Sequence, residues 1–350
     1  MNNGKPIVIA GPCSVESREQ LRAVALALTE MPEVSMVRCG VWKPRTRPGG
    51  FEGLGEPALR WMVDIAQELA QDGKTIEFAC EVARQEHVEL VLKYGLKWVW
   101  IGARTTASPF MVQELTEALR GTDLTVLVKN APSPDVRLWM GAIERCRQVG
   151  MKEVMAVHRG FDVFKNGGYR NHPLWEVPIE LRRAMPEVPI ITDPSHIAGR
   201  RELLEEVAQS ALDLGFDGLM IEVHPHPEEA LTDGQQQVTP NGLKELLGNL
   251  TFRQTESVVA DEELRLLRSR IDRIDDQLLR LLASRLEVSE KIAQVKARDN
   301  LAVFQPKRWD SLLQQRLSEA IDLGLEQEFV KEIFEKIHAE SVRVQMNAKG

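Results

Sequence analysis

Charged side chains follow several of the short apolar segments in the first 250 residues of this sequence. Lys43, Arg45, Arg104, Lys129 and Arg159 all occupy such positions. Cations gathered in one place would repel one another unless they bind anions. Arginine offers a planar fork that fits phosphate and carboxylate, and lysine offers a compact charge. The pattern therefore predicts a site for more than one anionic group, such as two phosphorylated substrates.

A second set of side chains has the types that bind divalent metal ions. Cys13, His196, Glu222 and Asp233 follow the first, seventh and eighth apolar segments. One thiolate, one imidazole and two carboxylates suit a first-row ion such as Mn, Fe, Co or Zn better than Mg or Ca. Spacing alone leaves another interpretation of Cys13 open, because a cysteine after a strand is often a small buried apolar residue.

Eight apolar, β-rich segments must position these groups, and helical patterns lie between them. The segments are Pro6–Ala10, Met36–Cys39, Thr75–Ala79, Trp98–Ile101, Thr125–Val128, Val154–Val157, Pro189–Thr192 and Gly218–Val223. Helical patterns include Glu56–Gln71, Pro109–Arg120, Arg137–Val149 and Arg201–Leu214. Eight βα units in about 250 residues predict an α/β fold, the (β/α)8 barrel, with its active site at the carboxyl ends of the strands. A doubly wound open sheet is the alternative, which the lack of a Gly-x-Gly-x-x-Gly motif after the first segment disfavours.

The composition of the chain changes near residue 255. Residues 1–255 hold 22 of the 24 glycines and 17 of the 18 prolines. Charged residues make up 62 of the first 255 positions but 34 of the last 95. We therefore expect a barrel domain at 1–250, a short linker at 251–260 and a charged helical domain at 261–350.

Charge and apolar content exclude several classes of partner. The net charge of −8 argues against a generic nucleic-acid binder. Apolar runs fall short of the roughly 20 residues that a membrane span needs, and the N-terminal residues do not resemble a signal peptide. Four scattered cysteines do not form a disulfide scaffold. We expect a cytoplasmic protein without a membrane or nucleic-acid partner.

Five segments of the first domain resemble the type I beta 3-deoxy-D-arabino-heptulosonate-7-phosphate (DAHP) synthases. They are Ile9-Ala10-Gly11-Pro12-Cys13-Ser14-Val15-Glu16, Lys43-Pro44-Arg45-Thr46, Ile101-Gly102-Ala103-Arg104-Thr105, Asp193-Pro194-Ser195-His196 and Ile221-Glu222-Val223-His224-Pro225. The resemblance implies a TIM barrel that condenses phosphoenolpyruvate with erythrose 4-phosphate and releases phosphate. The sister activity, 3-deoxy-manno-octulosonate-8-phosphate synthase, is the alternative. Its sequences resemble Lys-Ala-Asn-Arg-Ser after the second strand, so Lys-Pro-Arg-Thr favours the four-carbon sugar.

The same resemblance assigns roles to individual residues. It implies one divalent ion, Mn2+ or similar, held by Cys13, His196, Glu222 and Asp233. Phosphoenolpyruvate would bind Lys43, Arg104, Lys129 and Arg159, and erythrose 4-phosphate would bind Arg45 and Thr46. Lys43 is the candidate for proton transfer, and we expect neighbouring cations to lower its pKa. Arg47 departs from the family, where serine is common.

Residues 261–298 contain no glycine or proline and predict one long helix, roughly 55 Å in length. Its heptad pairs are Leu264/Leu267, Ile271/Ile274, Leu278/Leu281, Arg285/Val288 and Ile292/Val295. Such a seam needs a partner helix, in the same chain or in another copy. Two shorter helices are expected at 306–322 and 327–345. Arg285 in the seam either specifies the register or, because an unpaired buried guanidinium is costly, binds an anion.

Residues 256–345 resemble the all-helical chorismate mutases. The matching motifs are Leu267-Arg268-x-x-Ile271, Ile274-Asp275, Leu281-Leu282-Ala283-x-Arg285, Lys296 and Glu340-Ser341-x-x-x-Gln345. The family implies an intertwined homodimer that rearranges chorismate to prephenate in a pocket completed by one arginine of the partner. The matched pocket positions are Arg268, Arg285, Lys296, Arg308, Ser341 and Gln345. Of these, Lys296 and Gln345 would donate hydrogen bonds to the ether oxygen.

Trp309 departs from this second family, in which many members have glutamate at that place. Two alternatives therefore stay open for the helical domain, a non-catalytic sensor of chorismate or prephenate and a structural dimerisation arm. A pocket for a branch-point compound that forms several steps later, fused to a first-step synthase, suggests feedback, so we expect prephenate or chorismate to inhibit the barrel.

Overall fold

The computed structural model describes residues 6–43, 49–164, 167–253 and 261–347, with side chains of the last segment from residue 264 onward. The chain divides into two compact units, Met1–Thr255 and Glu256–Gly350. Among the described residues, no helix is both long enough and apolar enough to cross a membrane.

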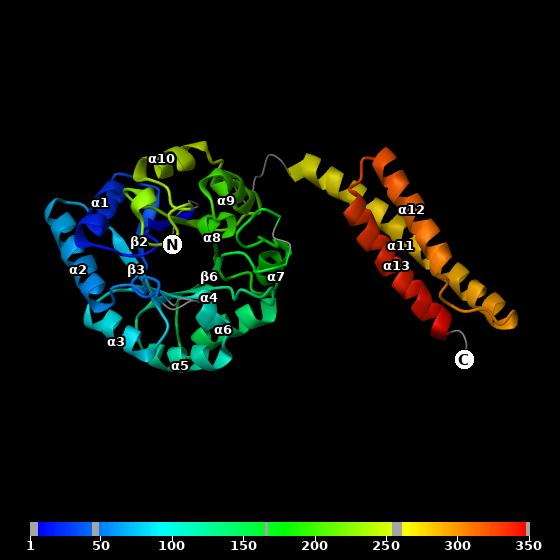
Figure 1. Cartoon of the computed structure of the whole chain (residues 1–350), viewed down its shortest axis with the longest axis horizontal. Helices are drawn as coiled ribbons and strands as arrows, with labels where there is room; N and C mark the ends of the chain where they lie inside the picture. Colours follow the sequence, from blue (N-terminus) through cyan, green and yellow to red (C-terminus); the bar gives the residue numbers. More distant parts are fainter. Residues whose placement is uncertain (1–5, 44–48, 165–166, 254–260, 348–350) are drawn as a thin grey trace. The chain divides into compact units, whose positions relative to one another are not determined.

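The first unit is a closed barrel of eight parallel strands, which neighbour one another in chain order (Figure 1). The strands are β1 (Ile7–Gly11), β2 (Val34–Cys39), β3 (Glu77–Val82), β4 (Trp98–Ile101), β5 (Thr125–Lys129), β6 (Val154–His158), β7 (Ile190–Thr192) and β8 (Gly218–Glu222). Strand β1 pairs with β8 from Ile7↔Gly218 to Gly11↔Glu222, which closes the ring. The predicted (β/α)8 barrel is confirmed, and the open-sheet alternative is wrong.

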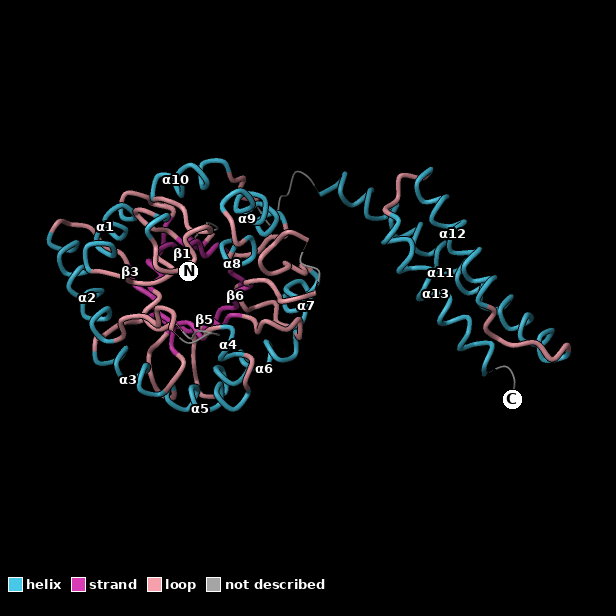
Figure 2. Tube along the Cα trace, viewed as in Figure 1, coloured by secondary structure: helices cyan, strands magenta, loops and turns pink. Residues whose placement is uncertain are grey.

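Helices surround the strands on the outside of the barrel (Figure 2). They are α1 (Arg18–Thr29), α2 (Glu56–Gln71), α3 (Gln85–Lys93), α4 (Ala103–Thr106), α5 (Pro109–Leu119), α6 (Val136–Gln148), α7 (Glu176–Ala184), α8 (Pro194–Ala198), α9 (Leu204–Asp213) and α10 (Pro240–Asn249). Side chains that accept hydrogen bonds from the first backbone N–H groups fix where several of these helices begin. Ser17, for example, accepts a hydrogen bond from the backbone N–H of Gln20, and Asp135 accepts from those of Arg137 and Leu138.

Some boundaries differ from the sequence-based expectation. Strand β3 begins and ends later than the predicted Thr75–Ala79, so Cys80 and Glu81 lie in the strand and not after it. The ladder continues beyond the apolar run, because Cys80 pairs with Cys39 and Glu81 pairs with Trp100. The helix expected at Arg201–Leu214 is a 3₁₀ turn at Arg201–Leu203 followed by α9. Helices α4 and α8 were not expected, since they are too short to show a 3.6-residue period.

The barrel has two apolar layers because successive strand residues point to opposite faces. The outward-facing residues pack against the helices in one continuous cluster. The inward-facing cluster fills the barrel with side chains from all eight strands: Ile9, Met36, Ala79, Trp100, Leu127, Met155, Val157, Ile191 and Met220. We call this inward-facing cluster the apolar floor, because it fills the barrel below the carboxyl ends of the strands.

In the second unit the described residues form the helices α11 (Asp261–Arg298), α12 (Pro306–Asp322) and α13 (Gln327–Asn347). Helix α13 extends two residues beyond the expected Gln345. Few apolar side chains of the second unit are buried within one copy. Most of the α11 seam is exposed, including Leu267, Ile271, Ile274, Leu278, Leu281, Val288, Ile292 and Val295.

Candidate active sites

A polar layer lies directly above the apolar floor, at the carboxyl ends of the strands. Inward-facing positions recur every two residues. The position two residues after each floor residue is therefore the next one to face inward. Those positions hold Gly11, Arg38, Glu81, Gly102, Lys129, Arg159, Asp193 and Glu222. Six of these eight residues are charged. The apolar interior of the barrel is therefore followed, one inward-facing position later on each strand, by a charged layer.

The two glycines of this layer allow close approach of their neighbours, a charged side chain at Gly102 and the adjacent backbone at Gly11. A Cβ atom at Gly102 would lie 2.2 Å from Oε1 of Glu81. A Cβ atom at Gly11, whose φ is +148°, would lie 2.3 Å from the backbone oxygen of Arg38. Neither position accepts a side chain without moving its neighbour.

Above this layer is a small hollow of about 90 Å³, called the rim hollow here. Its lining comprises Lys43, Glu81, Gly102, Ala103, Arg104, Lys129, Arg159, Arg170, His196 and Asp233. The structure thus brings together all four cations expected to bind phosphoenolpyruvate. Arg45 and Thr46, expected to bind erythrose 4-phosphate, lie outside the described residues, as does Arg47.

Burial weakens the charged form of two of these cations. It lowers the pKa of Lys129, although Nζ lies 2.8 Å from Oδ2 of Asp193. It also lowers the pKa of Arg159 to about 10. Nη1 of Arg159 donates to Oδ1 of Asn171 at 2.9 Å. Both groups are desolvated cations. Lys129 is paired with Asp193, whereas Arg159 donates to a neutral amide of the described residues, which favours binding of an anionic ligand there.

Lys43 behaves differently from expectation. Its Nζ donates to the backbone oxygen of Cys13 at 3.1 Å and to its Sγ at 3.0 Å. Burial acts to lower its pKa, but Cys13 and Glu222 together raise the pKa above its ordinary value. The expectation that neighbouring cations lower this pKa is wrong, because these acidic groups lie close to the ammonium and outweigh the nearby guanidinium of Arg38. The amine of Lys43 is therefore charged in this site.

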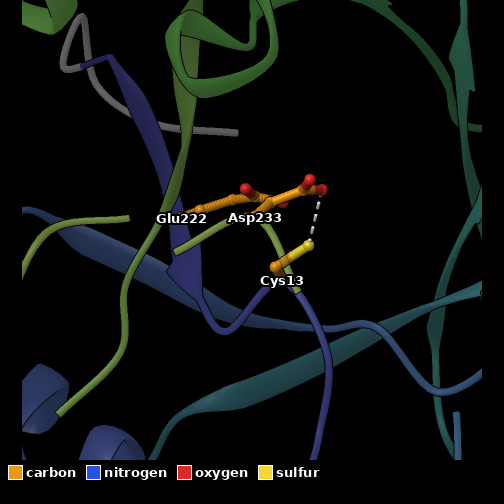
Figure 3. A group of neighbouring side chains, drawn as sticks. All are labelled: Cys13, Glu222 and Asp233. Carbon is orange, nitrogen blue, oxygen red and sulfur yellow. Dashed lines mark hydrogen bonds between the residues drawn. The ribbon is translucent and has the colours of Figure 1, made fainter. Parts of the chain in front are cut away.

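Three of the four predicted metal ligands meet beside the rim hollow. One ligand atom each of Cys13, Glu222 and Asp233 lies within 4.8 Å of the other two (Figure 3). Sγ of Cys13 donates to Oδ2 of Asp233 at 3.3 Å. Oε1 of Glu222 is buried without an aligned hydrogen bond among the described residues, although Nη2 of Arg38 is 3.0 Å away. A thiol and two converging carboxylates fit a first-row divalent ion.

His196 lies beside these three residues. Its Nε2 is 3.8 Å from Oε1 of Glu222, and its Nδ1 is 2.8 Å from Oδ2 of Asp193. A carboxylate on one ring nitrogen orients the other toward a metal. Burial lowers the pKa of His196 to about 4, so the ring is neutral and able to ligate. Burial raises the pKa of Cys13 to about 12, so the thiol must lose its proton when a metal binds.

Sequence reasoning assigned no role to four residues of this site: Arg38, Glu81, Arg170 and Asp193. Arg38 is 1% exposed and pairs with Glu222 and Asp193 below the metal ligands. The sequence does offer a sign of its importance, since a charged residue within an otherwise apolar strand needs a buried partner. Glu81 accepts from Nε1 of Trp100 at 3.1 Å. Arg170 has no comparable signal, because it lies in the long connection after β6.

The helical unit brings four of its six predicted pocket residues into contact in two pairs. Nη1 of Arg285 donates to Oγ of Ser341. Nζ of Lys296 donates to Oε1 of Gln345 at 3.1 Å, and also to the backbone oxygen of Val303 at 2.6 Å. Ser341 and Gln345 are buried, and they lie one helical turn apart on α13. The two cations of α11 therefore face one side of α13.

The other two predicted residues lie farther away. Arg308, at the start of α12, lines an open hollow of about 590 Å³ with Phe304, Gln305, Pro306 and Lys307. Arg268 precedes Arg285 by 17 positions, roughly 26 Å along α11, so it is not part of the same pocket within one copy. Trp309, the departure from the family pattern, stacks on His338 with ring centroids 4.0 Å apart.

Known proteins resemble the two units separately. The sequence model of the DAHP synthetase I family matches residues 2–256, and that of chorismate mutase type II matches residues 267–346. Phospho-2-dehydro-3-deoxyheptonate aldolase of Thermotoga maritima is 32% identical over 247 residues, which cover 71% of this chain and 69% of that protein. The crystal structure of the Thermotoga maritima DAHP synthase superposes with a TM-score of 0.62 at 30% identity, covering 70% of this chain and 68% of that one.

Two further relatives bear on the alternatives. The 2-dehydro-3-deoxyphosphooctonate aldolase of Desulfotalea psychrophila is 32% identical over 277 residues, covering 71% of this chain and 90% of that protein. The T-protein of Enterobacter agglomerans is 38% identical over 88 residues, covering 25% of this chain and 23% of that protein. The chain belongs to the DAHP synthetase I family and carries a chorismate mutase type II domain at its C-terminal end, so it is a bifunctional enzyme.

Proposed function

We propose that the barrel condenses phosphoenolpyruvate with erythrose 4-phosphate, and that the residues of the rim hollow carry out this reaction. The observation that carries the proposal is the convergence of four cations on one hollow beside a set of metal ligands. Arg104, Lys129 and Arg159 would hold the carboxylate and phosphate of the enol phosphate. Desolvated cations bind such groups more strongly than solvated ones do.

The chemistry follows from that placement. A divalent ion, when bound by Cys13, His196, Glu222 and Asp233, supplies Lewis acidity toward the aldehyde. The cations hold the methylene carbon of the enol phosphate against the aldehyde carbon, and a carbon–carbon bond forms. Lys43 donates its proton to the aldehyde oxygen, which becomes a hydroxyl. Water adds to the oxocarbenium carbon and returns one proton to the amine of Lys43. The carbon–oxygen bond to phosphate then breaks as the new hydroxyl becomes the ketone of the product, and its proton leaves with inorganic phosphate.

The choice of aldose phosphate rests on the segment Lys43-Pro44-Arg45-Thr46. Loss of phosphoenolpyruvate should be measured with erythrose 4-phosphate and, in parallel, with arabinose 5-phosphate. We expect kcat/KM to be on the order of 100-fold higher for the four-carbon sugar, a usual size for discrimination between close analogues. Faster turnover of the five-carbon sugar would make this barrel a 3-deoxy-manno-octulosonate-8-phosphate synthase.

We also propose that the helical unit works as a homodimer that rearranges chorismate to prephenate. The exposed α11 seam supports the dimer, because the nine aliphatic side chains at its heptad positions, from Leu264 to Val295, are exposed within one copy. In such a dimer, Arg268 of the partner copy would complete the pocket formed by Arg285, Lys296, Arg308, Ser341 and Gln345. Lys296 and Gln345 would stabilise charge that develops on the ether oxygen. If chorismate binds without turnover, the unit is instead a sensor.

Prephenate is expected to inhibit the synthase of the full chain, because the product of the helical unit accumulates in that pocket. A ligand regulates a distant site whenever it binds two arrangements of the protein with different affinity. Truncation after Leu250 should remove this inhibition, and the dimer with it. The measurement is synthase rate against prephenate concentration, with sedimentation of both proteins. Equal inhibition of both forms would place the feedback site in the barrel.

A further inference from the structure

Gln236 occupies a central place in the loop between β8 and α10. Its side chain is 1% exposed, and both ends of its amide are used. Nε2 donates to Oε2 of Glu222 at 2.6 Å, and Oε1 accepts from Nη1 of Arg170 at 2.6 Å. The amide therefore joins a carboxylate on β8 to an arginine in the β6–α7 connection.

Arg170 extends this chain of contacts to a second carboxylate. The same Nη1 donates to Oδ1 of Asp233 at 2.9 Å. Glu222, Gln236, Arg170 and Asp233 thus form one continuous chain of hydrogen bonds and an ion pair. The chain links two of the three residues whose ligand atoms lie within 4.8 Å of one another.

Each carboxylate in this chain has one oxygen held and one oxygen directed toward the metal ligands. Oδ1 of Asp233 binds Arg170, while Oδ2 accepts from Cys13 at 3.3 Å. Oε2 of Glu222 binds Gln236, while Oε1 is buried without an aligned hydrogen bond among the described residues. A carboxylate held in this way cannot rotate, so it presents a fixed oxygen to an ion.

We propose that Gln236 is a positioning residue for the metal site, which fixes Glu222 directly and fixes Asp233 through Arg170. The inference rests on the metal-dependent synthase proposed above. Residues that hold metal ligands commonly change metal affinity tenfold to a hundredfold when they are removed. A neutral amide suits this place, because it donates to Glu222 without adding positive charge that would repel a divalent ion.

The alternative is that Gln236 only fills space. Leucine would fill a similar volume, but it would leave Oε2 of Glu222 buried without a donor and Arg170 without one acceptor. The chain offers a matched control in Gln235, which is the adjacent residue, is exposed and makes no hydrogen bond with the described residues. Both glutamines line a hollow of about 560 Å³ next to the site.

The test compares Gln236→Leu with Gln235→Leu in the full chain. Metal-free protein is titrated with Mn2+ by calorimetry, and the Co2+ form is examined by its visible absorption spectrum. We expect Gln236→Leu to weaken Mn2+ binding by about tenfold or more and to alter the Co2+ bands, which report ligand geometry. Gln235→Leu should match the wild type in both measurements.

A second pair of variants tests the same chain of contacts if Gln236→Leu does not fold. Arg170→Lys keeps the charge but removes the guanidinium whose Nη1 contacts both Gln236 and Asp233, and an ammonium on a shorter, flexible stem does not hold a donor at the same point. We expect Arg170→Lys to bind Mn2+ more weakly than the wild type does. Arg200→Lys should bind Mn2+ with wild-type affinity. The side chain of Arg200 lines the same hollow and makes no ion pair or hydrogen bond within the described part of the chain.

The possible negative results differ in what they overturn. Folded Gln236→Leu with wild-type Mn2+ affinity and an unchanged Co2+ spectrum would overturn the positioning role. If Gln236→Leu does not fold, wild-type Mn2+ affinity of Arg170→Lys would do the same. A wild-type protein that binds no divalent ion would overturn the proposed metal-dependent reaction itself.

Discussion

Removal of divalent metal from this protein should abolish the condensation of phosphoenolpyruvate with erythrose 4-phosphate, and Mn2+ or a similar ion should restore it. Without the ion, the aldehyde loses the Lewis acid that polarises it, a loss of several kcal/mol of charge stabilisation. We expect the rate to fall by at least about 1,000-fold. The measurement is phosphate release after chelation and after stepwise addition of metal.

A pair of histidine variants assigns this effect to the site. His196→Ala removes a neutral imidazole whose Nε2 lies 3.8 Å from Oε1 of Glu222, so metal content and synthase activity should be lost together. His226→Ala is the matched control, because His226 is exposed in the loop that follows β8. Full synthase activity in thoroughly metal-free protein would refute the assignment of these ligands.

Replacement of Arg285 by alanine should remove chorismate mutase activity and leave the synthase intact. Arg285 contacts the buried Ser341, and burial lowers the pKa of its guanidinium, which indicates a partly desolvated cation. We expect kcat/KM for chorismate to fall by at least about 100-fold, as when one preorganised donor is removed. Prephenate formation is the measurement, and circular dichroism checks the helices.

Arg280→Ala serves as the control, because Arg280 lies on the same helix and is exposed. Mixing Arg268→Ala with Arg285→Ala protein also tests the shared pocket. If each pocket takes Arg268 from the partner copy, mixed dimers have one intact site, and the mixture should recover roughly one quarter of wild-type activity. No recovery after subunit exchange would place both arginines in one copy. Turnover that is insensitive to Arg285 would refute the pocket.

The architecture was accessible from the sequence because it depends on local patterns. Eight β-rich segments with helical patterns between them predicted the barrel, and α2 and α11 have the bounds that their patterns predict. The cations that follow strands were predicted to converge on one rim, and Lys43, Arg104, Lys129 and Arg159 all line the rim hollow. A (β/α)8 barrel brings all strand ends to one face, so topology alone decides that convergence.

Other features depended on contacts between residues far apart in the chain. The end of β3 was placed too early, because its last residues are held by pairing with β2 and β4 and not by apolar character. The pKa of Lys43 was predicted in the wrong direction, since its sign depends on the distances to Cys13 and Glu222. Arg38 and Gln236 were overlooked because each acts through a carboxylate on another segment.

The physical reason is the range of the interactions concerned. Hydrophobic periodicity and capping act over a few residues, so one sequence reveals where strands and helices form. The electrostatics of a buried site depend on burial and on charges within several ångströms, whatever their separation in sequence. For this protein, the sequence determined the elements and the chemical types at their ends. Only the tertiary structure decided which oxygen of Glu222 is held by Gln236 and which is left for a metal.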